Sequence, residues 1–175
     1  MKDEARSPDI IPHLRITRGL TVADLGAGGG YFSVKIAREV GPKGRVFAVD
    51  IDPDSLQFII EYAGKEGAAN VETVAGTFED LGLKEHSTDM VFIRNAYHDF
   101  KGRVDYFRNL RKSLRNGGRI VVIDYDPKKL CFIKRLFGHS VDERVIIDEM
   151  GKAGYRHIAS HSFLPEQSFN IFSPE

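Results

Sequence analysis

The glycine-rich turn at residues 26–30 constrains the fold of this chain more than any other feature of its sequence. The turn follows an apolar run at residues 21–25 and precedes residues 31–40, whose apolar side chains recur at helical spacing. Glycines let a backbone bend sharply and approach a ligand closely, and a helix N-terminus favours negative charge on that ligand. The pattern predicts a strand, a tight ligand-binding turn and a helix.

Three glycines of this turn, Gly26, Gly28 and Gly30, stand at alternate positions. A dinucleotide-binding turn needs Gly or Ala at the sixth position counted from Gly26, but Tyr31 stands there. Asp24 lies near the end of the predicted strand, where a buried carboxylate is costly without a partner. The glycines therefore either form only a tight turn or bind a ligand that does not need the dinucleotide pattern.

Asp50 directly follows the second predicted strand, residues 45–49. In nucleotide-binding α/β folds, a carboxylate at this place accepts hydrogen bonds from ribose hydroxyls. The alternative is that Asp50 only begins the next helix. Asp52 is better placed for that, because Pro53 follows it as a first helical residue. The sequence thus favours a ligand-binding role for Asp50.

Further apolar runs predict strands at residues 70–75, 88–93 and 119–125. The helix before the last of these strands has an apolar stripe from Val104 to Leu114 and is expected to end at the Asn-Gly-Gly of residues 116–118. Alternating strands and helices are typical of a parallel α/β sheet.

The last third of the chain predicts a helix at residues 141–153 and strands at 155–160 and 167–172. Only six residues separate the two strands, whereas a parallel crossover needs a dozen or more residues. We therefore expect these strands to pair antiparallel, which places one reversed strand near an edge of the sheet.

Composition limits the classes of protein that the chain can belong to. Its 175 residues correspond to about one domain. With 25 basic and 25 acidic residues and 42% hydrophobic residues, it is typical of a soluble globular domain rather than a disordered chain. The balanced charge gives no strong signal for nucleic-acid binding. The sequence has no apolar run long enough to span a membrane, and we expect a cytoplasmic location.

The motifs together resemble those of class I S-adenosylmethionine-dependent methyltransferases. The segments that carry the resemblance are VADLGAGGGYFS, VFAVDIDPDSL, VAGTFEDLGLKEHSTDMVFIRNAYHDF and LRNGGRIVVIDYDP, and the C-terminal EMGKAGYRHIASHSFLPEQSFNIF resembles the last helix and hairpin of the same fold. The resemblance implies one α/β domain over residues 1–175, a Rossmann-like, seven-stranded, mostly parallel sheet in the order 3-2-1-4-5-7-6, and an antiparallel strand 7. It also implies S-adenosylmethionine as cofactor and S-adenosylhomocysteine as product.

The same resemblance implies the cofactor contacts. The backbone of residues 26–28 would lie under the methionine part, Asp24 would orient the loop or reach the amino group, and Asp50 would hold the ribose diol. Related proteins often carry Asp where Thr77 stands, and a neutral hydroxyl should hold the adenine amino group less well. Ile51, Thr77 and Phe78 would surround adenine, and Arg94 and Asn95 would line the pocket at the end of strand four. The complete set of implied cofactor contacts is Asp24, Gly26, Ala27, Gly28, Gly30, Asp50, Ile51, Thr77, Phe78, Arg94 and Asn95.

The loop after strand four is the expected place for a catalytic group, and His98 is our candidate. Histidine has a reference pKa of about 6.5, which suits a general base near neutral pH. The alternative is a loop histidine that only packs or caps the next helix. For the neighbouring Tyr97 we favour packing over catalysis.

The sequence narrows the acceptor without identifying it. The loop lacks the Asn/Asp-Pro-Pro-aromatic motif of enzymes that methylate the amino groups of nucleic-acid bases. Cys131 is the only cysteine, which disfavours cysteine-nucleophile and arsenite methylation and excludes an intrachain disulfide. Asp124 and Asp126 have no third carboxylate to complete a magnesium site, and the spacing of the other histidines does not indicate a metal site, so we expect no metal.

Within the family, the resemblance is greatest to ubiquinone/menaquinone-biosynthesis C-methyltransferases and related small-molecule enzymes, so a small-molecule acceptor is favoured. An RNA or protein methyltransferase and a non-catalytic cofactor-binding partner subunit remain alternatives. Residues 1–18 are a candidate lid, and residues 126–140 a possible substrate loop. Basic and apolar residues interleave at residues 128–137. We expect that segment to cover the pocket, with ordinary surface packing and peripheral membrane contact as alternatives.

Overall fold

One seven-stranded sheet forms the centre of the molecule. The computed structural model describes residues 10–77, 79–131 and 139–175. The strands are β1 (Thr21–Leu25), β2 (Arg45–Asp50), β3 (Val71–Ala75), β4 (Thr88–Arg94), β5 (Leu114–Tyr125), β6 (Tyr155–Ser160) and β7 (Gln167–Pro174). Their order in the sheet is β3-β2-β1-β4-β5-β7-β6. The first five are parallel, and β7 pairs antiparallel with both β5 and β6, which confirms the predicted topology.

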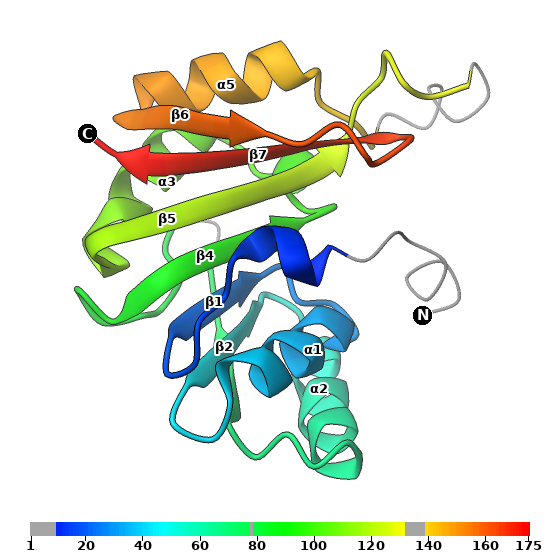
Figure 1. Ribbon diagram of the computed structural model, residues 1–175, viewed down its shortest axis with the longest axis vertical. Helices are drawn as coiled ribbons and strands as arrows, with labels where there is room; N and C mark the ends of the chain where they lie inside the picture. The colour runs from blue at the N-terminus through cyan, green and yellow to red at the C-terminus, as the bar shows by residue number, and fades with distance from the viewer. Residues whose placement is uncertain (1–9, 78, 132–138) are drawn as a thin grey trace.

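Helices cover both faces of the sheet (Figure 1). The 3₁₀ turn η2 (Ile11–Leu14), α1 (Tyr31–Val40) and α2 (Pro53–Lys65) contribute to the apolar layer on one face. The 3₁₀ turn η3 (Tyr97–Asp99), α3 (Arg103–Leu110) and α5 (Glu143–Lys152) contribute to the layer on the other. Successive strand residues alternate between the layers, because side chains alternate across a strand. Thus Val22 packs with η2 and α1, whereas Ala23 packs with α3 and α5.

Local sequence explains where the first two helices begin. Gly30 is the N-cap of α1 in a left-handed conformation, which glycine adopts without steric cost. The Asp52 carboxylate caps α2 by accepting hydrogen bonds from the Asp54 and Ser55 N–H groups, both at 3.2 Å. Both helix starts lie where the sequence predicted them.

The segment before β5 differs from our expectation. Helix α3 ends at Leu110, a 3₁₀ turn η4 (Arg111–Ser113) follows, and Leu114 is the first residue of β5 rather than the last turn of a helix. Leu114 pairs with Thr88 of β4, after which the register shifts. Within the shifted segment, Gly117 has a φ of +77°. The Gly-Gly pair therefore marks an irregularity inside a long strand, not the end of a helix.

The carboxyl ends of the parallel strands share the right-hand edge of the sheet in Figure 1. Because β7 is reversed, its first residues lie at this same edge, beside Asp124 and Tyr125 at the end of β5. Loops from distant parts of the chain therefore meet there. Among the described residues, the structure has no helix of the length and apolarity that a membrane span requires.

Candidate functional site

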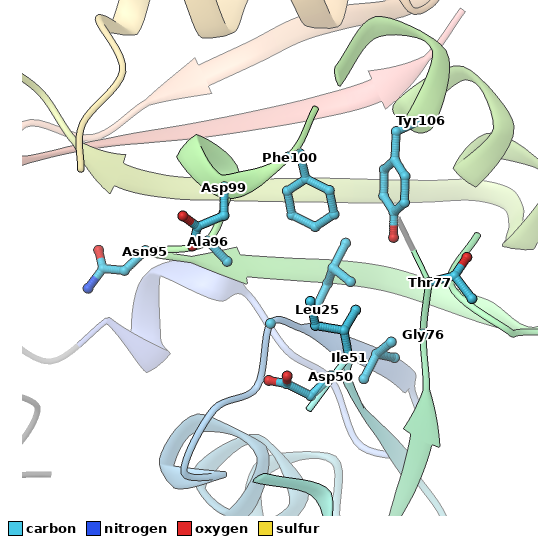
Figure 2. A pocket seen from close by; sticks show the side chains of 12 residues that line it. Leu25, Asp50, Ile51, Gly76, Thr77, Asn95, Ala96, Asp99, Phe100 and Tyr106 are labelled. Carbon is cyan, nitrogen blue, oxygen red and sulfur yellow. The ribbon is translucent and has the colours of Figure 1, made fainter. Parts of the chain in front are cut away.

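A cavity lies where β1, β2 and β4 end (Figure 2). It contains about 670 Å³ of space free of protein atoms, part of it open to solvent. Ligand sites in α/β folds occur at this edge, where the strand order reverses. The lining residues are Leu25, Gly26, Val49, Asp50, Ile51, Gly76, Thr77, Asn95, Ala96, Asp99, Phe100 and Tyr106.

The glycine turn has a backbone that other residues would not readily adopt. Gly26, Gly28 and Gly30 all have positive φ, at +73°, +51° and +72°. A Cβ on Gly26 would lie 2.5 Å from the Cβ of Ala96, in the loop after β4. The alternate glycines therefore allow both the bend of the turn and its close approach to β4.

Asp50 holds this turn in place. Its Oδ2 accepts a hydrogen bond from the Gly28 N–H at 2.8 Å, and its Oδ1 accepts one from the Asp52 N–H at 3.1 Å. A carboxylate oxygen can accept more than one hydrogen bond, so both oxygens keep capacity for a ligand. The sequence predicted a ligand contact for Asp50 but not this link to the turn.

Asp24 has the partner that its burial requires. It is only 3% exposed, and its Oδ2 accepts a hydrogen bond from the Ser33 hydroxyl in α1 at 2.6 Å. Asp24 does not line the cavity. Its contact joins the strand before the glycine turn to the helix after it, which supports the orienting role among the two expected for this residue.

The remaining expected contacts around adenine lie on separate segments. Ile51 follows Asp50, and its side chain is 52% exposed at the cavity rim. Thr77 lines the cavity from the segment after β3. Phe78 lies outside the described residues. Of the other expected residues, Ala27, Gly28, Gly30 and Arg94 do not line the cavity, whereas Gly26 and Asn95 do.

The end of β4 is tied to the start of β7. Asn95 has a φ of +55°, a conformation that costs energy for a residue other than glycine, and its Oδ1 accepts a hydrogen bond from Gln167 Nε2. Arg94 Nη2 lies 3.5 Å from Gln167 Oε1, and its guanidinium lies 4.7 Å from the Phe32 ring centroid. Arg94 thus faces β7 beside the cavity, and Gln167 is a site residue that the sequence analysis missed.

His98, in η3, forms a dyad with Asp124 at the end of β5. Its Nδ1 lies 2.9 Å from Asp124 Oδ1, and its backbone N–H donates to Asp124 Oδ2 at 2.9 Å. The Asp124 side chain is completely buried. The hydrogen bond to Asp124 raises the pKa of His98 above its usual range, although burial opposes the shift. A carboxylate on Nδ1 fixes the tautomer and leaves Nε2 as the proton acceptor.

Asp124 is the second site residue whose role the sequence analysis missed. We had considered it only as a magnesium ligand. Strands four and five were expected to lie side by side, so their ends were expected at the same edge. The expected neighbourhood of the two strand ends was the signal in the sequence that could have suggested a contact between Asp124 and His98. It does not specify which side chains meet.

Tyr97 packs instead of facing the cavity, as predicted. Its ring is fully buried and stacks on Phe107 with ring centroids 5.1 Å apart. Its hydroxyl donates to Glu149 Oε2 at 2.9 Å, and Arg103 donates to both oxygens of the same carboxylate. Tyr97 therefore contributes to the junction of η3, α3 and α5.

The fold brings together three possible metal ligands that the spacing of histidines in the sequence does not indicate. Atoms of His98, Asp99 and His139 that could bind a metal all lie within 4.8 Å of one another. The rings of His98 and His139 meet edge to face, with centroids 5.3 Å apart. Asp99 Oδ1 lies 3.6 Å from His98 Nε2. The same Nε2 atom would be needed either for a metal ion or for proton transfer.

The glycine turn after β1, the carboxylate at the end of β2 and the reversed β7 define the fold of class I S-adenosylmethionine-dependent methyltransferases. The family model described as a methyltransferase domain matches residues 16–159, and the chain belongs to this family. A solved S-adenosylmethionine-dependent methyltransferase from Aquifex aeolicus has the same fold, with a TM-score of 0.84 at 20% identity over 93% of this chain and 86% of that one.

Two relatives show the range of names in the family. An arsenite methyltransferase from Halobacterium salinarum is 33% identical over 106 residues, which are 61% of this chain and 27% of that protein. A demethylmenaquinone methyltransferase from Listeria welshimeri is 24% identical over 155 residues, which are 89% of this chain and 65% of that protein. The chain thus spans less than two thirds of the length of either relative.

Proposed function

We propose that this protein transfers a methyl group from S-adenosylmethionine to a small-molecule acceptor and that His98 accepts the acceptor's proton. One observation carries the proposal. The cavity that contains Asp50 and the glycine turn is also lined by Ala96, Asp99 and Phe100, which belong to the same loop as His98. Residues on both sides of His98 in the sequence therefore line the cavity that we assign to the cofactor.

The residues around the cavity suit this cofactor. Gly26 lines the cavity and has no side chain to cover its backbone, so that backbone is available to a ligand. Asp50 offers carboxylate oxygens with remaining capacity to accept hydrogen bonds from a ribose diol. The half-exposed Ile51 gives an apolar surface for one face of adenine. When bound, S-adenosylmethionine supplies a methyl group on a positively charged sulfur, which is a strong electrophile.

The protein's own contribution to methyl transfer is positioning and proton removal. Holding two reactants in line can supply several kcal/mol of the barrier reduction. Asp124 orients His98 through Nδ1, so that Nε2 can take a proton from the acceptor as the new bond forms. The resulting imidazolium lies between the Asp124 and Asp99 carboxylates, which stabilise its charge. An acceptor that must lose a proton, such as a phenol or an activated aromatic carbon, fits this arrangement.

The relatives support a small aromatic acceptor more than an inorganic one. Thiol capture of arsenite needs several cysteines, and this sequence has only Cys131. The match to demethylmenaquinone methyltransferase covers more of the chain than the match to arsenite methyltransferase. We therefore propose an aromatic acceptor of the quinol or phenol class. We also propose a cytoplasmic location, a lid role for residues 1–18 and a substrate-loop role for residues 126–140. Residues 1–9 of the first segment and 132–138 of the second lie outside the described residues.

Calorimetric titration with S-adenosylmethionine, S-adenosylhomocysteine and NAD tests the cofactor. We expect micromolar binding of the first two and no binding of NAD. Transfer of labelled methyl from S-adenosylmethionine to separate pools of small aromatic metabolites, RNA and protein then tests the acceptor. Label in RNA or protein would replace our acceptor class with another. Cofactor binding without transfer to any pool would indicate a non-catalytic partner subunit.

A further inference from the structure

The hydroxyl of Thr77 is fully used inside its own turn. Its Oγ1 accepts hydrogen bonds from the Glu79 N–H at 3.1 Å and the Asp80 N–H at 3.0 Å, and it lies 3.4 Å from the Asp80 carbonyl oxygen, to which it donates. A hydroxyl has one proton to donate and two lone pairs that accept. Thr77 can therefore contact a ligand through its oxygen only if a bond of the turn is broken.

Another hydroxyl in the same cavity is buried and has no hydrogen-bond partner in the part of the chain that the structure describes. Tyr106 projects from α3, is 3% exposed and lines the cavity beside Phe100, with ring centroids 4.6 Å apart. Its hydroxyl oxygen makes no hydrogen bond to any of the described residues. Figure 2 shows this oxygen at the end of the cavity where Thr77 lies. A buried polar group without a partner is destabilising, so a ligand that satisfies it gains affinity.

The surroundings keep this hydroxyl in its neutral form. Burial, together with the negative charge of Asp80, raises the pKa of Tyr106 well above its usual range. The phenol therefore keeps its proton near neutral pH, and its oxygen retains lone pairs for a donor on a ligand. Because the ring is packed against Phe100 and Phe107, the hydroxyl is also held in position.

We propose that Tyr106 is the specificity-determining contact for the purine of the cofactor, with its hydroxyl oxygen accepting a hydrogen bond from the exocyclic amino group. The inference rests on the proposed function, because it takes the adenine to lie between Ile51 and Phe100 in this cavity. It moves the recognition of that amino group from Thr77, where the family resemblance places it, to a residue of α3.

A cycle of two proteins and two ligands tests the contact. The ligands are S-adenosylhomocysteine and its analogue with hydrogen in place of the purine amino group, and the proteins are the wild type and Tyr106→Phe. One neutral hydrogen bond corresponds to a change in Kd of about three- to tenfold. We expect the wild type to bind the analogue weaker by this factor and Tyr106→Phe to bind both ligands equally within about twofold. Calorimetry gives all four Kd values.

One further variant makes the result specific. Tyr155 is also a buried tyrosine, but its hydroxyl donates to the Phe107 carbonyl at 2.8 Å and lies outside the cavity. Tyr155→Phe should therefore preserve the discrimination between the ligands.

Three outcomes would overturn the inference. Unchanged discrimination in Tyr106→Phe excludes its hydroxyl. If the wild type binds S-adenosylhomocysteine but does not distinguish the analogue, no residue recognises the amino group. If the wild type does not bind S-adenosylhomocysteine at all, the proposed function fails as well, which separates that failure from the other results.

Discussion

The carboxylate of Asp50 accepts a hydrogen bond from the backbone N–H of Gly28 at 2.8 Å. The residue expected to hold the ribose therefore also closes the glycine turn that would lie under the methionine part. Cofactor contact and loop geometry are coupled through one side chain.

Replacement of Asp50 should weaken cofactor binding strongly. Asp50→Ala removes charge-assisted hydrogen bonds of roughly 1.5–3 kcal/mol each, so the Kd for S-adenosylhomocysteine should rise at least about tenfold. Asp54→Ala, which removes the same charge from an exposed position nearby, should leave the Kd within about twofold. Calorimetry measures both, and an unchanged Kd in a folded Asp50→Ala protein would remove Asp50 from the site.

The close approach of Gly26 to Ala96 predicts that alanine destabilises the fold more at Gly26 than at Gly28. Gly26→Ala adds a Cβ 2.5 Å from another Cβ at a φ of +73°, whereas Gly28→Ala has open space at +51°. The overlap costs about 1–3 kcal/mol, in addition to about 1–2 kcal/mol for the left-handed backbone in either variant. Thermal unfolding should give Gly26→Ala the lower Tm. Combining it with Ala96→Gly should recover the Tm of Gly28→Ala, and no recovery would contradict the packing argument.

The dyad predicts how turnover depends on pH. The pKa of His98 is raised by Asp124, and a base works only when deprotonated, so kcat should rise with pH and level off above a midpoint that lies above the usual histidine value. Asp124→Asn removes the main cause and should shift that midpoint to lower pH. His98→Ala should lower kcat about 100-fold or more with little change in the Kd for S-adenosylhomocysteine. Equal turnover rates from pH 6 to pH 9 in the wild type would exclude His98 as the base.

The pair of His98 and Asp124 also predicts that part of the free energy of unfolding depends on pH. Because the folded-state pKa of His98 is raised, protonated His98 stabilises the fold fully below its unfolded-state pKa. This contribution disappears as pH rises through the folded-state pKa. The difference in Tm between the wild type and His98→Gln should therefore shrink from pH 6 to pH 9, as seen by thermal unfolding at a series of pH values. A difference that grows with pH would mean that the interaction has the opposite sign.

Metal ions should inhibit rather than support methyl transfer. We expect a chelator to leave the rate unchanged, because His98 Nε2 is assigned to the proton. Zn²⁺ should lower the rate by occupying His98, Asp99 and His139, since imidazole and carboxylate are common zinc ligands. His139→Ala should restore the rate in zinc. Loss of activity on chelation, recovered by adding metal back, would instead show that the cluster is a working metal centre.

The positions of most strands and the antiparallel pairing of β6 and β7 were predictable from local sequence, whereas the order of the strands in the sheet came from the family resemblance. Apolar runs, the glycine turn and the six-residue loop between the last two strands all depend on neighbours along the chain. The start of β5 was not predictable in this way. Leu114 continues the apolar stripe of a helix, but its pairing with Thr88 draws it into the sheet, and that contact is between residues distant in sequence.

The site shows the same division between local and distant contacts. Asp24, Gly26 and Asp50 are recognisable from their positions at or directly beside strand ends. The partners of His98 and Asn95, which are Asp124 and Gln167, depend on which side chains meet across β4, β5 and β7. The saturation of the Thr77 hydroxyl depends on a turn whose hydrogen bonds cannot be read from composition.

The reversed course of β7 has a consequence for synthesis on the ribosome. All residues that line the cavity precede Phe107 in the chain, whereas Gln167, which fastens Asn95, is made much later. Translation proceeds from the N-terminus, and nascent chains begin to fold in that order. All residues that line the cavity are therefore synthesised before the residue that holds the Asn95 side chain in place.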